Sequence, residues 1–146
     1  MSAGAFATSV VLLFSVLQPP LASAAQTLAQ VQADRGFKAI VVRSESGLDE
    51  MTTSGITNVW DATTTEVRAI NFDPTPFNLT PATLEDLRGG DANANAQIVR
   101  DVLDGRDDGR FAAIRDVVAL NAAAALVAFN ATQTGHRYGR NVPLET

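Results

Sequence analysis

Two adjacent carboxylates, Asp49 and Glu50, are the strongest candidates for a functional site in this sequence. Neighbouring carboxylates repel each other and raise the pKa of one of them, so a bound cation relieves an unfavourable interaction. Mg²⁺ suits such a pair, because it takes hard oxygen ligands, few of them from protein, and completes its shell with waters and phosphate oxygens. The pair therefore predicts a magnesium site. Taken alone, the two residues favour the alternative of a solvated turn, since adjacent acids are common on protein surfaces.

Other polar residues favour structural interpretations. The glycine-bearing acidic segment 104–109 lacks the EF-hand ligand spacing and its closing Glu, so we expect a solvated loop between helices. Segment 88–91 resembles a phosphate-loop fragment, but a helix stop followed by an aspartate N-cap is the better interpretation. Asn121 lies in an apolar run and is expected to tie secondary elements together. His136, the single histidine, has no partner for a metal or catalytic set.

The elements before the acid pair predict an α/β fold. Residues 37–42 contain the run 39–42, which is apolar on both faces, as is typical of a parallel strand covered by helices on both sides. The polar segment 44–50 follows, at the position where ligand sites gather in open α/β sheets. An Ala-rich helix is predicted over 21–31 and a further buried strand over 10–17. We therefore expect a partial parallel or mixed sheet flanked by helices.

The remaining elements follow from local signals. Residues 57–60 and 63–70 read as two short strands, with the hairpin as one arrangement, and 71–81 as a proline-rich loop. Thr80 is a candidate N-cap for a short helix that Gly89-Gly90 ends, and Asp91 caps a second helix that ends at Gly105. A third helix over 111–129 is apolar on nearly every face, which predicts that it is buried. The predicted domain is 1–130, with a divergent, disordered tail over 131–146.

Composition narrows the classes of partner and the compartment. The 146 residues carry 11 basic and 16 acidic side chains, a net charge of -5, and no basic stripe, so nucleic acid is not expected. The absence of cysteine suits a reduced, cytoplasmic compartment. The apolar run 10–17 is too short to span a bilayer, and no membrane partner is expected. Export is the alternative, because residues 1–24 resemble a signal peptide, but residues 1–17 contain no Lys or Arg.

Three stretches in register carry a family resemblance: 47–55 (GLDEMTTSG), 84–91 (LEDLRGGD) with Asn95-Ala96 after it, and 120–126 (LNAAAAL). They resemble anthranilate phosphoribosyltransferase, specifically the C-terminal part of its glycosyltransferase family 3 domain. The segment 16–22 before the first helix resembles the same family. The resemblance implies a phosphoribosyltransferase or nucleoside phosphorylase-like α/β fold.

The resemblance also implies a reaction, namely Mg²⁺-dependent transfer of phosphoribosyl from PRPP to the amino group of anthranilate in tryptophan biosynthesis, releasing pyrophosphate. The acids of the family's GLDE motif match Asp49 and Glu50, which makes these two the expected metal ligands. A metal at the diphosphate neutralises charge that builds on the leaving group.

The sequence departs from the family where it lacks a GTGGD-like phosphate loop, a KHGN-type segment and the helical N-terminal domain. We therefore expect a truncated enzyme that is inactive alone, since the metal pair without a phosphate cradle forgoes most transition-state binding. The alternatives are a non-catalytic remnant or gene-model fragment, and one half of a split enzyme that associates with a missing N-terminal portion.

Overall fold

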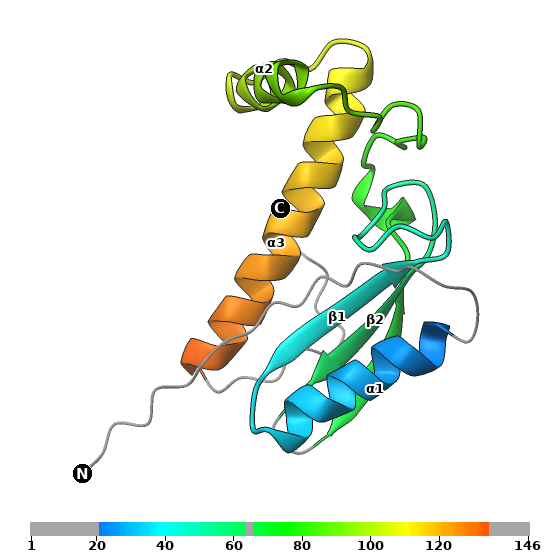
Figure 1. Cartoon of the computed structure of the whole chain (residues 1–146), viewed down its shortest axis with the longest axis vertical. Helices are drawn as coiled ribbons and strands as arrows, with labels where there is room; N and C mark the ends of the chain where they lie inside the picture. Colours follow the sequence, from blue (N-terminus) through cyan, green and yellow to red (C-terminus); the bar gives the residue numbers. More distant parts are fainter. Residues whose placement is uncertain (1–20, 64–65, 135–146) are drawn as a thin grey trace.

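An antiparallel sheet separates two helices that cover its opposite faces (Figure 1). The computed structural model describes residues 21–63 and 66–134. Within them the strands are β1 (Ala39–Ser44), β2 (Thr57–Ala62) and β3 (Val67–Phe72), in the order β1-β2-β3. The α/β class predicted from the sequence is confirmed.

The predicted parallel or mixed arrangement is wrong for the described strands. β1 pairs antiparallel with β2, with Val42 opposite Val59, and β2 pairs antiparallel with β3, with Trp60 opposite Ala69. A parallel pair needs a long crossover, usually through a helix, whereas the loop 45–56 returns the chain directly beside β1. The hairpin of β2 and β3 is confirmed, but its bounds differ from the prediction: Asp61 and Ala62 belong to β2, and β3 begins at Val67. The predicted strand 10–17 lies outside the described residues.

Helix α1 (Leu21–Asp34) covers one face of the sheet. Its alanines recur every four residues, and their small side chains let the helix lie close to the strands. Trp60 of β2 fills this layer and is only 6% exposed. The buried residues that meet here are Ala25, Ala29, Ala33, Ala39, Val41, Trp60 and Ala62.

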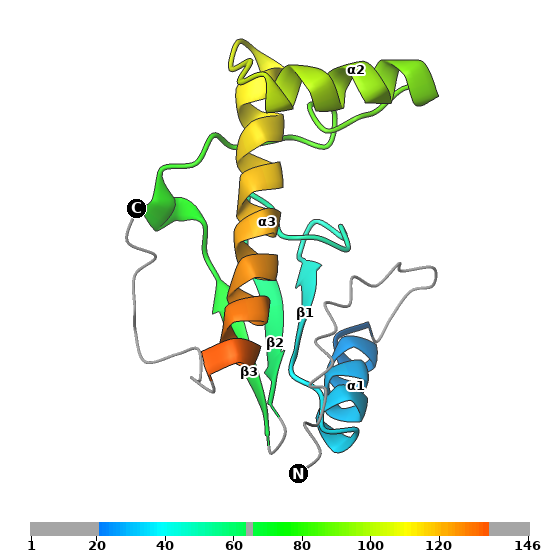
Figure 2. The ribbon, with the colours of Figure 1, turned by 90° about the vertical axis from the view of Figure 1, so that its left-hand side faces the viewer.

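Helix α3 (Arg110–Thr134) packs against the other face, so that the sheet lies between α1 and α3 (Figure 2). Leu120 meets Val42, Val59 and Met51 in this second cluster. The helix begins one residue before the predicted range and continues to Thr134, so residues 131–134 are helical. The rest of the predicted tail lies outside the described residues.

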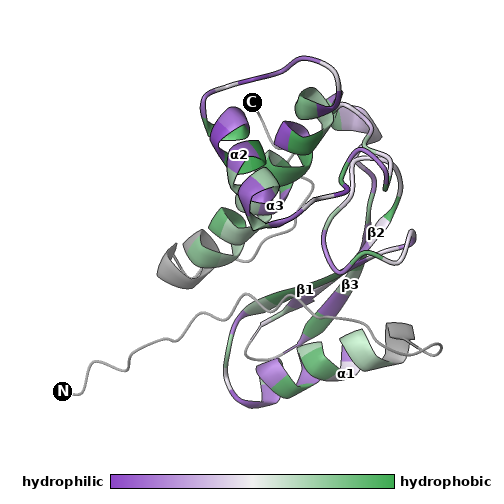
Figure 3. Cartoon of the chain, turned by 45° about the horizontal axis from the view of Figure 1, so that its top comes forward, coloured by the Kyte–Doolittle hydropathy of each residue, from purple (hydrophilic) through white to green (hydrophobic). Residues whose placement is uncertain are grey.

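The predicted burial of α3 on nearly every face is wrong. Val118, Leu126 and Phe129 are 50%, 62% and 49% exposed, and with exposed Ala122 they form one stripe, here called the outer stripe of α3. Figure 3 shows apolar residues on most of the described length of this helix. A single sheet covers only one side of a helix, and the described residues supply no second covering layer for α3.

The stretch Arg110–Phe129 is long and apolar enough, by length and composition, to cross a membrane, and little of it is buried in the fold. Length and composition alone are weak evidence for a span. Its contacts are those of a helix packed on its own chain, because Leu120 lies in the core and Asp116 and Asn121 bond to loops. The expectation of no membrane partner stays a prediction.

Helix α2 (Ala92–Leu103) crosses the N-terminal end of α3 (Figures 1 and 2). Asp91 is its N-cap, accepting a 2.9 Å hydrogen bond from the Ala94 N–H, and Gly105 follows its end at φ +81°, as predicted. The short helix predicted after Thr80 is wrong. Thr83 instead exchanges bonds with Asp86 and caps one isolated turn at 84–87. A 3-10 turn, η1 (Thr75–Phe77), lies within the predicted loop.

Candidate metal-binding loop

The acid pair follows a tight turn at the end of β1. Ser44 is fully buried, its N–H donates to the Leu48 carbonyl at 3.0 Å, and its Oγ accepts from the Leu48 N–H at 2.9 Å. Gly47 lies within this turn at φ +92°, a conformation that a residue with a side chain adopts only with strain. The turn therefore fixes where the chain leaves the strand, immediately before Asp49.

Asp49 and Glu50 are both half-buried in the loop that connects β1 to β2. Burial raises the pKa of Glu50 above its ordinary value, and the neighbouring charge of Asp49 raises it further. Burial is thus the larger cause of the raised pKa of Glu50, and the repulsion expected within the pair is the smaller one. Within residues 21–63 and 66–134, no group of three or more His, Cys, Asp and Glu could hold a metal ion. A two-acid site suits Mg²⁺, which uses few protein ligands, better than Zn²⁺ or Ca²⁺.

Asn121 of α3 holds the residue directly after the pair. Its Oδ1 accepts from the Met51 N–H at 3.0 Å, and its Nδ2 donates to the Met51 carbonyl at 3.0 Å and to the Val117 carbonyl at 2.9 Å. The predicted role of Asn121 as a tie between secondary elements is confirmed. The Met51 side chain is buried beside Leu120, so both its backbone and its side chain join the loop to α3.

Short hydroxyl side chains lock the end of the loop, and we did not predict this role from the sequence. Thr53 is buried; its Oγ1 donates to the Thr80 carbonyl at 2.9 Å and accepts from the Ala82 N–H at 3.0 Å. The Ser54 hydroxyl donates to the Ala82 carbonyl. The available signal was a run of Thr and Ser directly before a strand, because these residues often bond to nearby backbone groups.

Asp116 of α3 binds the same segment, accepting from the Thr80 N–H at 2.8 Å and from the Arg115 guanidinium at 3.1 Å. Burial acts to raise the pKa of Asp116, but the Thr80 hydrogen bonds and the Arg115 charge outweigh it and hold the pKa below the ordinary 3.8. The charged carboxylate is thus favoured in the folded chain.

The lowered pKa of Asp116 should make the free energy of unfolding depend on pH in the acidic range. A carboxylate whose pKa is lowered on folding stabilises the fold at pH values above its pKa in the unfolded chain. That stabilisation is lost as the pH falls through its pKa in the folded chain. Urea unfolding between about pH 2 and 5 should show a decline in the free energy of unfolding that is shallower in Asp116→Asn. Parallel declines for the two proteins would contradict this assignment.

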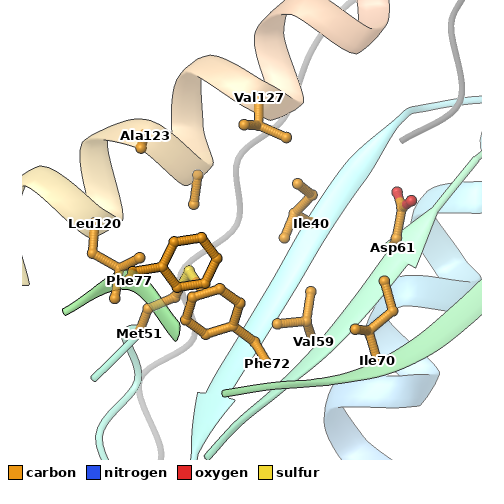
Figure 4. A pocket seen from close by; sticks show the side chains of 11 residues that line it. Ile40, Met51, Val59, Asp61, Ile70, Phe72, Phe77, Leu120, Ala123 and Val127 are labelled. Carbon is orange, nitrogen blue, oxygen red and sulfur yellow. The ribbon is translucent and has the colours of Figure 1, made fainter. Parts of the chain in front are cut away.

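An apolar cavity of about 250 Å³ lies between α3 and the sheet (Figure 4). Neither Asp49 nor Glu50 lines it, and Asp61 is its one charged residue. The cavity is therefore separate from the acid pair and touches the loop only through Met51. Its lining is Ile40, Met51, Val59, Asp61, Ile70, Phe72, Phe77, Leu120, Ala123, Ala124 and Val127.

The other segments considered from the sequence have structural roles. At 88–91 the chain follows the isolated turn, and Asn95 binds both backbone groups of Gly90, at 2.8 and 3.0 Å. The acidic segment 104–109 is an exposed loop, where Arg106 pairs with Asp101 and Asp108. Because Arg106 already binds these carboxylates, they are not available to a calcium ion, in line with the expected solvated loop. His136 lies outside the described residues.

Known proteins resemble this chain over most of its length. The model of the family described as "Glycosyl transferase family, a/b domain" matches residues 7–142. Anthranilate phosphoribosyltransferase of Arthrobacter sp. (strain FB24) is 48% identical over 111 residues, which are 76% of this chain and 30% of that protein. The enzyme of the same name from Thermobifida fusca (strain YX) is 46% identical over 70% of this chain and 28% of its own length.

Solved structures agree with the sequence matches. Anthranilate phosphoribosyltransferase from Saccharomyces cerevisiae in complex with PRPP and Mg superposes with a TM-score of 0.64 at 26% identity, over 77% of this chain and 31% of that one. The same yeast enzyme in a structure without those ligands in its description gives a TM-score of 0.61. The chain thus spans less than a third of the length of these relatives.

Proposed function

This chain belongs to the glycosyl transferase family, a/b domain, and on that premise we propose that it carries the metal-binding part of a phosphoribosyl transfer site. Asp49 and Glu50 would hold Mg²⁺ there. The observation that carries the proposal is the fixed presentation of two adjacent, half-buried carboxylates, one with a raised pKa, on a loop pinned at both ends. A divalent cation would replace their mutual repulsion with two favourable contacts.

The proposed reaction is based on the ligands of related enzymes. The yeast enzyme, for example, is described in complex with PRPP and Mg. When bound, Mg²⁺ would neutralise charge on the diphosphate leaving group. Asp49 and Glu50 would orient that diphosphate by fixing the cation at the end of β1. The acceptor by family resemblance is anthranilate, whose amine needs little activation, so positioning would supply much of the remaining rate.

We further propose that the described unit is inactive alone and needs a second body that covers α3. The outer stripe of α3 is exposed and apolar, as expected of a helix that normally packs between two layers. The part of the relatives that this chain does not match is the natural occupant, since they are more than three times as long as the matched region. A non-catalytic remnant of the family is the second candidate, favoured by the two-acid limit of the described site.

Magnesium titration followed by amide NMR tests the metal site. We expect Mg²⁺, with and without PRPP, to shift the amide signals around Asp49 and Glu50. The double variant Asp49→Asn, Glu50→Gln should lose affinity by about tenfold or more, or about 1.4 kcal/mol. The matched control is Asp107→Asn, Asp108→Asn, which removes an adjacent acid pair from the exposed loop between α2 and α3.

The two pairs separate specific from general binding. Equal loss of affinity in both double variants, or no response of the unaltered chain, would remove the proposed metal site. Transfer activity is tested separately by mixing the chain with the part of the Arthrobacter relative that it does not match. Magnesium binding without activity in that mixture would favour the remnant over the split enzyme.

A further inference from the structure

The geometry points to Asn121 as a positioning residue that sets the placement of Asp49 and Glu50 from helix α3, an inference that rests on the proposed function. The acid pair sits between two fixed points. On one side Ser44 closes the turn onto Leu48, and on the other Asn121 holds Met51. Only the two acids lie between Leu48 and Met51, so fixing these flanking residues restricts the backbone of both.

The amide of Asn121 is fully used at this point. Its oxygen takes the Met51 N–H, and one hydrogen-bond donation of its nitrogen goes to the Met51 carbonyl. A second donation goes to the Val117 carbonyl, one turn back on α3, which holds the side chain in the orientation that faces the loop. An amide has one acceptor and two donor hydrogens, so every group has a partner and a rotated amide would lose bonds.

The two hydrogen bonds from Asn121 to the Met51 backbone, here called the Asn121 clamp, act on the acid pair through a short and rigid connection. Met51 follows Glu50 directly, and its side chain is buried beside Leu120, the helix neighbour of Asn121. A shift of α3 along the sheet would therefore move the Met51 backbone and, with it, the spacing of the two carboxylates. Residues that support metal ligands from behind commonly change metal affinity by about tenfold or more when removed.

The chain contains its own matched control. Asn95 makes the same pair of bonds to a backbone residue, accepting from the Gly90 N–H at 2.8 Å and donating to the Gly90 carbonyl at 3.0 Å. This second clamp holds the turn before α2 and no residue adjacent to the acid pair. A general effect of losing an amide clamp should appear in both positions, whereas a positioning effect should appear only at Asn121.

The test compares Asn121→Leu and Asn95→Leu in the full chain, both of which remove the bonds and keep the bulk. Binding is followed by amide NMR titration with MgCl₂. We expect Asn121→Leu to weaken Mg²⁺ binding by about tenfold and Asn95→Leu to leave it within about twofold. Asn121→Ala, which keeps less bulk but risks no clash, serves if the leucine variant does not fold. A folded Asn121 variant with unaltered Mg²⁺ affinity would overturn the inference.

A second readout separates this inference from the proposed function. Heteronuclear NOE values and hydrogen exchange report the order of residues 49–51 without any metal. We expect Asn121→Leu to lower the order of these residues and speed exchange of the Met51 amide, with no such change in Asn95→Leu. If the unaltered chain does not bind Mg²⁺, the proposed metal site is wrong. The order and exchange measurements would still show whether Asn121 holds residues 49–51 in place. Unchanged order at residues 49–51 would contradict the positioning role directly.

Discussion

Trp60→Ala is expected to lower the free energy of unfolding by about 3–5 kcal/mol, the range for deleting a large buried aromatic side chain. Trp60 is 6% exposed and meets alanines of α1 as well as strand residues. Alanine side chains are too small to move into the space that the indole would leave. Since small domains have only about 5–15 kcal/mol of stability, the variant should unfold at a much lower urea concentration.

Two further variants serve as controls for Trp60→Ala. Trp60→Phe keeps most of the buried area and should lose clearly less stability than the alanine variant. Val118→Ala removes an apolar side chain from the outer stripe of α3, where it is half-exposed, and should change stability by no more than about 0.5 kcal/mol. A loss in Val118→Ala as large as that in Trp60→Ala would mean that the outer stripe is buried in the folded protein.

Elements with strong local signals were predictable from the sequence. Asp91 as an N-cap and Gly105 after the end of α2 each depend on a few neighbouring residues, and both are confirmed. The direction of β1 had no such signal. A strand buried on both faces looks apolar whether its neighbours are parallel or antiparallel, and the deciding fact is where the loop 45–56 returns.

The burial of α3 failed as a prediction for a related reason. Its apolar residues lie on nearly every face, and composition reports what could be buried, not what covers it. The described residues cover the side that carries Leu120 and leave Val118 and Leu126 exposed. Within residues 21–63 and 66–134, nothing covers the side of α3 that carries these exposed residues.

The candidate site, too, was predictable only in part: its residues could be identified from the sequence, but the contacts between them could not. Asp49 and Glu50 were identified from their adjacency and from the family resemblance, and Asn121 from an amide in an apolar run. Their connection was not predictable, because Asn121 and Met51 are 70 residues apart in sequence. The bonds of Thr53 to residues 80–82 likewise join segments separated by 27 and 29 residues. Patterns in one sequence report local structure well and such pairings poorly.

Thr53→Val is the second change with a large expected effect, about 2–4 kcal/mol of unfolding free energy, since it leaves two backbone groups without partners. Valine has nearly the shape of threonine, so packing at this site, 5% exposed, is preserved while the bonds to Thr80 and Ala82 are lost. Water cannot easily replace them there. Thr53→Ser keeps the hydroxyl and should recover much of the loss.

Thr83→Val is the matched control, because the Thr83 hydroxyl also makes two bonds, accepting from the Asp86 N–H and donating to its carboxylate, but in an exposed turn. Water can take over both bonds, so the cost should stay near 1 kcal/mol, typical of a lost cap. Urea unfolding of the three variants measures the difference. Equal losses in Thr53→Val and Thr83→Val would show that burial does not decide the value of these bonds.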